Sequence, residues 1–360
     1  MKMKVCLVSH EFPPSLGGAG VVASEIYNVM KKDDNFTLLT SVSCGVDDNN
    51  IIKVNTKKIV RPLQYSTKLY SLRNKVDTFI LNDTRSHLAA ALTFNKKIIG
   101  KSIIYIHGEE AKDYLDKGKS NRFLYQLYYL LILNCKHVVF VSKYIKEQFL
   151  DITGFDWINR KSSVINNGVN IRNSIVDLSP PLTLIDFNKN NKTVLVSASR
   201  IVKGKGYLEK LNFFQNFEND KYIWLVLGTG DYFDEFKKEI NKRNLSDSVI
   251  LLGAVKRENL PAIYSYCDVF WLLSNFKEAH PLVYMEASVS GLPSVGYDKY
   301  GTKESIAHNI TGQLISTSST QYDVEKAISA CLSLDREDIS KYASEKFSVE
   351  EMVHKLKIVL

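Results

Sequence analysis

The chain of 360 residues contains no long hydrophobic run, no low-complexity tract and no internal repeat. Its longest apolar stretch, Phe123–Leu133, contains Gln126 and is about half as long as a bilayer-spanning helix. The apolar residues Val5–Val8 suit a buried strand and are too few for a secretory signal. We therefore expect a cytoplasmic protein that does not cross a membrane.

Cysteine is scarce, and the five cysteines are scattered without a C-x-x-C pair or a metal-type spacing with histidine. Several of them stand in apolar, strand-like runs, which is typical of reduced core thiols in a cytosolic protein. The sequence therefore predicts neither a disulfide framework nor a bound metal. The cysteines are Cys6, Cys44, Cys135, Cys267 and Cys331.

Acidic residues are sparse in the first half of the chain. Residues 1–170 carry 24 Lys and Arg against 15 Asp and Glu, whereas residues 171–360 carry 23 against 24. The excess is greatest in residues 51–101, where Asp77 and Asp83 are the only acids. This half is expected to face phosphate or an anionic lipid surface. No zinc-finger, RNP-like or helix-turn-helix pattern supports nucleic-acid binding.

Short runs of Val, Ile and Leu recur between helical stretches in both halves of the chain. Runs without polar alternation indicate strands buried on both faces, hence parallel sheets covered by helices. We expect an α/β protein with two doubly wound domains, residues 1–170 and 193–348, joined by a proline-bearing linker at 171–192. The expected strands are Val5–Ser9, Phe36–Ser41, Thr78–Leu81, Ile103–Ile106, His137–Val141, Ser163–Ile165, Thr193–Ala198, Tyr222–Leu227, Val249–Leu252, Val269–Leu273, Pro293–Gly296 and Gln313–Ile315.

A glycine-rich segment, Glu11–Gly20, follows the first expected strand and precedes a helix predicted from about Val21. Glycine lets backbone amides approach a phosphate closely. The glycines lie too far past the strand for a dinucleotide fingerprint, and the second strand ends without a ribose-binding acid. A phosphate-binding loop and a merely flexible loop both fit the segment.

A basic loop, Ser199–Gly206, follows the first strand of the second half. Arg200 offers a planar fork and a lysine offers a point charge, which together suit a diphosphate. Lys203-Gly204 and Lys205-Gly206 are alternative sites for that lysine. An exposed basic loop without a ligand is the other interpretation.

Two glutamates flank a helix start at Pro281. Glu278 is expected before the helix and Glu286 within it. Carboxylates accept paired hydrogen bonds from vicinal hydroxyls, as sugar and ribose rings require. A local cap or salt bridge is the alternative role for Glu286.

These segments together resemble glycosyltransferase family 4, whose members are retaining enzymes of the GT-B fold with two Rossmann-like domains facing a cleft. The resemblance rests on Glu278-x7-Glu286, Arg200 with Lys205-Gly206, Gly17-Gly18 and Gly291-Leu292-Pro293. Similar segments occur in order along the chain: 106–108, 141–143, 164–169, 226–230 and 304–312. Ala279-His280 departs from the usual Gly-Phe, so His280 either lines the pocket or packs.

The resemblance implies catalytic roles for His107, Arg200, Lys205 and Glu278. Arg200 and Lys205 would neutralise the donor diphosphate, Glu278 would hold the transferred sugar, and His107 would contact that sugar. The implied donor-binding residues are Gly17, Gly18, Gly228, His280, Pro281, Leu282, Val283 and Glu286, with Glu286 on the ribose.

The implied activity is transfer of a hexose-type sugar from a UDP- or GDP-linked donor to a glycan or lipid-linked acceptor, in cell-surface polysaccharide synthesis. No cofactor or metal is implied. Residues 193–348 would bind the donor and the basic residues 1–170 the acceptor, with a helix at 349–360 returning to the first domain. The basic domain is also expected to dock peripherally on the inner face of the cell membrane. A sugar-nucleotide epimerase or hydrolase and a non-catalytic nucleotide-sugar-binding protein remain alternatives.

Overall fold

The computed structural model describes residues 3–14, 17–41, 44–45, 48–54, 61–116, 121–170, 191–218 and 221–360. The chain divides into two compact units. The first unit comprises residues 1–168 with 349–360, and the second comprises residues 169–348. Most of the expected linker, residues 171–190, lies outside the described residues.

The first unit is built on a parallel sheet of seven strands in the order β3-β2-β1-β4-β5-β6-β7. The strand order reverses beside β1, which pairs in parallel with both β2 and β4. In such sheets ligands bind beyond the carboxyl ends of the strands. The strands are β1 (Val5–Val8), β2 (Phe36–Ser41), β3 (Ile51–Val54), β4 (Thr78–Leu81), β5 (Ser102–Ile106), β6 (His137–Phe140) and β7 (Ser162–Val164).

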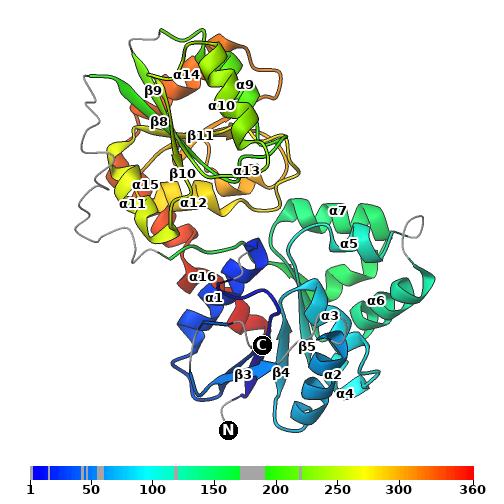
Figure 1. Cartoon of the computed structure of the whole chain (residues 1–360). Coiled ribbons are helices and arrows are strands. Elements are labelled where there is room, and N and C mark those ends of the chain that lie inside the picture. The colour runs from blue at the N-terminus through cyan, green and yellow to red at the C-terminus, as the bar shows by residue number, and fades with distance from the viewer. Residues whose placement is uncertain are drawn as a thin grey trace. The chain divides into compact units, whose positions relative to one another are not determined.

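Helices connect these strands and cover the sheet (Figure 1). The last helix of the chain, α16 (Val349–Val359), packs against α1 (Gly18–Met30). The other helical elements of this unit are α2 (Arg61–Leu72), α3 (Thr84–Ala91), α4 (Lys96–Ile99), α5 (Glu110–Tyr114), α6 (Arg122–Asn134), α7 (Lys143–Thr153) and η1 (Asp156–Lys161).

The second unit has a parallel sheet of six strands in the order β10-β9-β8-β11-β12-β13. Its strands are β8 (Thr193–Ala198), β9 (Tyr222–Leu227), β10 (Val249–Gly253), β11 (Val269–Leu272), β12 (Ser294–Tyr297) and β13 (Gly312–Ile315). Its helical elements are α9 (Tyr207–Phe214), α10 (Phe233–Lys242), η3 (Arg257–Asn259), α11 (Leu260–Tyr266), α12 (Leu282–Val289), α13 (Thr302–Ser305), α14 (Gln321–Leu332) and α15 (Arg336–Lys346). Among the described residues, no helix combines the length and apolarity needed to cross a membrane.

The expected α/β class with two doubly wound parallel sheets is confirmed. The sequence missed β3 because Ile-Ile-Lys-Val is half exposed and therefore does not resemble a buried run. The helix expected from about Val21 begins instead at Gly18, since Gly17 takes the extended N-cap conformation. The glycines thus belong to the helix start and not to a loop before it.

The core of the second unit encloses a lysine. Lys210 on α9 is completely buried, and its Nζ donates a hydrogen bond of 2.7 Å to Ser197 Oγ. The Nζ atom also lies 4.3 Å from the ring centre of Tyr207 and 4.8 Å from that of Trp224. Burial lowers the pKa of Lys210 well below its usual range, because the charged form loses its hydration.

We expect Lys210→Met to stabilise the protein at pH 7, by about 1–4 kcal/mol, the range found when buried ion pairs are replaced by well-packed apolar side chains. Lys210 has a lower pKa in the folded protein than in the unfolded chain, so between these two pKa values the unfolded chain binds more protons. The stability of the wild type should therefore rise with pH across that range. Urea unfolding followed by tryptophan fluorescence at pH 7 and pH 9 measures both effects. The exposed Lys238→Met is the control. Lower stability of Lys210→Met at pH 7 would contradict the expectation.

Candidate functional site

A pocket of about 260 Å³ opens at the carboxyl ends of β8, β9 and β10 in the second unit. Its walls combine apolar side chains with the glycine-bearing turn after β9, a composition typical of small-molecule sites. The exposed Arg200 stands at its rim. The lining residues are Ala198, Ser199, Arg200, Leu227, Gly228, Thr229, Ala254, Val255, Leu260 and Val283. The pocket therefore brings together three of the predicted residues, Arg200, Gly228 and Val283.

Close backbone packing shapes the loops around this pocket. Gly206 has φ +72°, and a Cβ at this position would collide with the carbonyl oxygen of Leu273. Gly228 has φ +134°, and a Cβ there would meet the carbonyl oxygen of Ser199. The amide of Asn275 also donates to the carbonyl of Gly204 at 2.7 Å. The basic loop is thus held directly against the end of β11, where larger residues would not fit.

Lys205 and Glu278 form a largely buried ion pair. Lys205 Nζ lies 2.5 Å from Glu278 Oε1, and the two side chains are 17% and 14% exposed. Ser274 Oγ donates to the same carboxylate oxygen at 2.7 Å. Lys203, in contrast, is 79% exposed and lies 4.0 Å from Glu235. Of the two candidate lysines, the fold therefore brings Lys205 to Glu278.

Glu286 lies inside α12, one turn beyond the pocket-lining Val283. Its Oε1 accepts a hydrogen bond of 2.6 Å from Nε of Arg257, which belongs to η3. Glu286 thus forms a salt bridge, as its alternative role requires, but with a partner that is distant in the sequence. Arg257 was missed in the sequence because no local pattern links it to a glutamate 29 residues away.

The residues between these glutamates differ in their surroundings. Pro281 is the N-cap of α12 and has extended φ and ψ. Leu282 packs against a small apolar cluster around Met285. His280 is buried, and burial lowers its pKa to about 4. It is therefore a neutral ring at neutral pH.

In the first unit, Gly17 and Gly18 form the start of α1. The carboxylate of Glu11 lies so close that a Cβ on Gly17 would collide with it. A backbone hydrogen bond from Gly20 favours the charged carboxylate, but burial and the nearby Asp83 raise the pKa of Glu11. The N-terminus of α1 therefore faces an acidic side chain.

His107 follows β5 at the carboxyl edge of the first sheet. Its Nε2 lies 3.1 Å from Asn82 Oδ1, and its ring stacks on Tyr105 with 5.3 Å between the centres. Glu110 accepts from the backbone amides of His107 and Gly108, at 2.9 and 2.7 Å. Burial lowers the pKa of His107 to about 4, so the ring is neutral at physiological pH.

Two family models match consecutive parts of the chain. The model described as Glycosyltransferase Family 4 matches residues 16–173, and the model described as Glycosyl transferases group 1 matches residues 185–346. Together they cover both units and include every predicted site residue. The chain belongs to glycosyltransferase family 4.

Curated relatives of this family 4 protein match over limited regions. An uncharacterised glycosyltransferase of Haemophilus influenzae is 26% identical over 203 residues, 52% of this chain and 55% of the relative. A GDP-mannose-dependent phosphatidylinositol monomannoside mannosyltransferase of Mycobacterium tuberculosis is 25% identical over 137 residues, 36% of each protein. The chain thus spans about half or less of the length of these relatives.

A solved structure matches nearly the whole chain. HepE of Anabaena, in complex with UDP and glucose, has a TM-score of 0.73 and 16% identity, and the match covers 99% of both chains. At this identity the likeness establishes the fold alone, and the family 4 protein has the GT-B fold.

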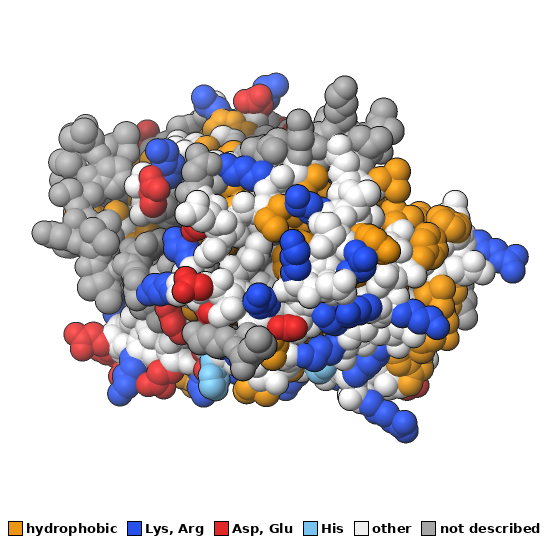
Figure 2. Space-filling model, turned by 90° about the horizontal axis from the view of Figure 1, so that it is seen from below, with side chains coloured by type: hydrophobic (Ala, Val, Ile, Leu, Met, Phe, Trp, Pro, Cys, Tyr) orange, Lys and Arg blue, Asp and Glu red, His pale blue; other side chains and the backbone are white. Residues whose placement is uncertain are grey.

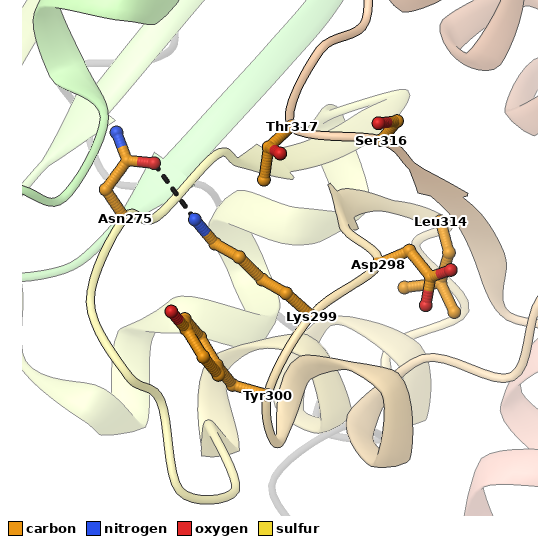
Figure 3. A pocket seen from close by; sticks show the side chains of 7 residues that line it. All are labelled: Asn275, Asp298, Lys299, Tyr300, Leu314, Ser316 and Thr317. Carbon is orange, nitrogen blue, oxygen red and sulfur yellow. Dashed lines mark hydrogen bonds between the residues drawn. The ribbon is translucent and has the colours of Figure 1, made fainter.

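A second pocket of the family 4 protein, of about 540 Å³, lies at the carboxyl ends of β12 and β13. Lys299 extends across it toward Asn275, and its Nζ donates to Asn275 Oδ1 at 3.0 Å (Figure 3). The backbone of Gly301 donates to the carbonyl of Glu278 at 2.8 Å, which ties this wall to the Lys205–Glu278 pair. The other lining residues are Asp298, Tyr300, Leu314, Ser316 and Thr317. The amide of Asn275, the ammonium of Lys299 and the hydroxyl and carboxylate groups of the other lining residues suit a hydroxyl-rich ligand.

We expect Gly206→Ala to destabilise the protein more than Gly253→Ala. Both glycines have left-handed backbones, with φ +72° and +69°, so each alanine costs about 1–2 kcal/mol. Only at Gly206 must the backbone of Leu273 also move, which should bring the loss beyond about 3 kcal/mol. Urea denaturation of both variants tests this comparison. Equal losses would show that the basic loop is not held by that contact.

Proposed function

We propose that the protein is a retaining glycosyltransferase that moves a hexose-type sugar from a UDP- or GDP-linked donor to a glycan or lipid-linked acceptor, in cell-surface polysaccharide synthesis. The observation that carries the proposal is the pair of ion pairs, Lys205–Glu278 and Arg257–Glu286, beside a pocket at the sheet edge. Two carboxylates and three cations are thereby available to one nucleotide sugar, counting the exposed Arg200.

The proposed donor pose follows from the chemistry of each group. The base enters the pocket around Gly228 and Val283, and Glu286 receives the ribose hydroxyls. Arg200 and Lys205 neutralise the diphosphate. When Lys205 turns to the phosphate, the carboxylate of Glu278 is released to accept hydrogen bonds from the transferred sugar. Donor binding thus gives both Lys205 and Glu278 a new partner in place of the one that each loses.

The proposed reaction breaks the bond between the anomeric carbon and the diphosphate oxygen. The acceptor hydroxyl oxygen bonds to the same carbon from the same face, and its proton passes to the leaving phosphate. Negative charge accumulates on the diphosphate, where Arg200 and Lys205 stabilise it. His107 contributes a neutral ring to the uncharged sugar.

A thermal-shift screen against UDP-, GDP-, ADP- and CMP-sugars tests the donor site, since a ligand that binds only the folded protein raises its melting temperature. We expect the sugars of one nucleotide to raise the melting temperature. A ligand at a hundredfold excess over its Kd stabilises the folded protein by about 3 kcal/mol, which corresponds to a shift of a few degrees. Glu286→Ala should lose the shift, whereas the exposed Glu345→Ala should retain it.

No shift with any nucleotide sugar, with acceptor absent or present, would contradict the proposal. Product analysis by mass spectrometry separates the remaining activities. A rearranged or released sugar without an acceptor would identify an epimerase or hydrolase. A shift without any turnover would identify a nucleotide-sugar-binding protein.

We propose further that the first unit docks on an anionic membrane carrying the acceptor. This unit carries several exposed lysines: Lys68 on α2, Lys75 between α2 and β4, and Lys96 on α4. α4 contacts α6, whose Phe123 and Leu130 are exposed. Figure 2 shows Lys and Arg side chains gathered beside a group of hydrophobic side chains at the right-hand edge of this face. Basic and apolar groups in this arrangement are typical of peripheral membrane binding.

Replacing Lys68, Lys75 and Lys96 by Gln should weaken binding to phosphatidylglycerol-containing vesicles by roughly a hundredfold, at about 1 kcal/mol for each lysine near the surface. Three exposed lysines of α10, Lys237, Lys238 and Lys242, supply the matched control. Vesicle co-sedimentation measures the change. Equal binding by the wild type, the variant and the control would rule out docking through Lys68, Lys75 and Lys96.

A further inference from the structure

Asn82 lies at the centre of a hydrogen-bond network in the first unit. It follows β4 and is completely buried. Its Nδ2 donates to the carbonyl oxygen of Ala19, at 2.9 Å, and to Ser9 Oγ, at 3.0 Å. Its Oδ1 lies 3.1 Å from Nε2 of His107. The network therefore joins the start of α1 and the ends of β1, β4 and β5.

The orientation of the Asn82 amide is determined by the Ala19 carbonyl. A carbonyl oxygen only accepts, so the amide NH2 must point toward Ala19 and the amide oxygen toward His107. Ser9 agrees with this orientation, because its hydroxyl donates to the carbonyl of Glu11 at 2.7 Å and is free to accept from Asn82. A flipped amide would place two oxygens in contact at Ala19.

This orientation decides which nitrogen of His107 carries the proton. An amide oxygen needs a donor opposite it, so the proton of the neutral imidazole is on Nε2. The other nitrogen, Nδ1, then has a lone pair and can only accept. Among the residues that the structure describes, none hydrogen-bonds to Nδ1, and His107 is partly exposed.

We infer that Asn82 is a positioning residue that holds His107 in the Nε2–H tautomer, so that the ring offers the substrate an acceptor at Nδ1. The consequence for specificity rests on the proposed function, in which His107 contacts the transferred sugar. A free hydroxyl of the sugar must donate to Nδ1. A sugar with hydrogen, fluorine or an ether oxygen at that position cannot donate to Nδ1 and is rejected.

The groups around His107 keep it uncharged. Asp83 and His87 face it from the start of α3, Glu110 from α5, and Tyr105 from its own strand. Asp83 favours the protonated ring, but its carboxylate already accepts from the backbone amides of His10, Glu11 and Ser86. Burial outweighs its attraction, and His87 opposes a second proton.

The decisive measurement is the tautomer of His107 in the full chain labelled with 15N at the histidine rings. Long-range 1H–15N correlation spectra distinguish a protonated from an unprotonated ring nitrogen, and His107→Gln assigns the signals by difference. We expect one tautomer with the proton on Nε2, unchanged from pH 8 to pH 6. A proton on Nδ1, or a mixture of the two tautomers, would overturn the inference.

Two variants test the role of Asn82 itself. Asn82→Leu removes the acceptor opposite Nε2 and should yield mixed tautomers of His107. Asn82→Asp keeps an acceptor there and should preserve the Nε2–H tautomer. Its negative charge should also raise the pKa of His107 from about 4 by about 1–3 pH units. Asn134→Leu and Asn134→Asp on the exposed end of α6 are the matched controls. A pure Nε2–H tautomer in folded Asn82→Leu would refute the positioning role, as would an unchanged midpoint in Asn82→Asp.

The tautomer spectra need no donor, so they separate this inference from the proposed function. A locked Nε2–H ring together with a failed nucleotide screen would remove the transferase activity but keep the role of Asn82. If transfer is observed, donors lacking single sugar hydroxyls complete the test. For one of these donors, kcat/KM of the wild type should be at least a hundredfold lower than for the complete donor. The corresponding decrease with Asn82→Leu should be much smaller. Equal losses in both proteins would contradict a specificity role.

Discussion

The ion pair between Lys205 and Glu278 is the contact on which the candidate site of the second unit depends. Both side chains are more than four-fifths buried, and an isolated charge at that depth would be expensive. Each therefore stabilises the other until a ligand supplies new partners. In the proposed donor pose, a nucleotide sugar brings a diphosphate for the lysine and hydroxyls for the glutamate, so each charge exchanges its present partner for a new one. A ligand with the diphosphate alone would leave Glu278 with the Ser274 hydroxyl as its hydrogen-bond donor.

The backbone around this ion pair limits what the site can tolerate. Gly206 and Gly228 adopt positive φ values where the carbonyls of Leu273 and Ser199 leave no room for a Cβ. The loops after β8 and β9 are thus packed main chain against main chain, and the positions of Arg200 and Lys205 follow from that packing. At this edge of the sheet the backbone packing places the charged side chains, because Gly206 follows Lys205 and Gly228 packs on Ser199, which precedes Arg200.

The sequence predicted what is encoded locally and missed what is encoded between distant segments. Buried strands such as Phe36–Ser41 were recognisable as apolar runs, while the half-exposed β3 was not. Glu278 and Glu286 stood out through their spacing. Their partners did not: Lys205 was one of two candidates, and Arg257 was not considered. Asn82 was also missed, since its partners Ala19 and His107 are 63 and 25 residues away.

The two units offer different chemistry, and the difference matches the parts of a nucleotide sugar. In the proposed donor pose, the second unit supplies cations for the diphosphate, where negative charge grows as this group leaves. The first unit supplies a ring that burial keeps neutral and whose inferred Nε2 proton points to Asn82. In the proposed function, a neutral acceptor at Nδ1 of His107 selects a sugar hydroxyl and adds no charge of its own, so the cations that neutralise the diphosphate all come from the second unit.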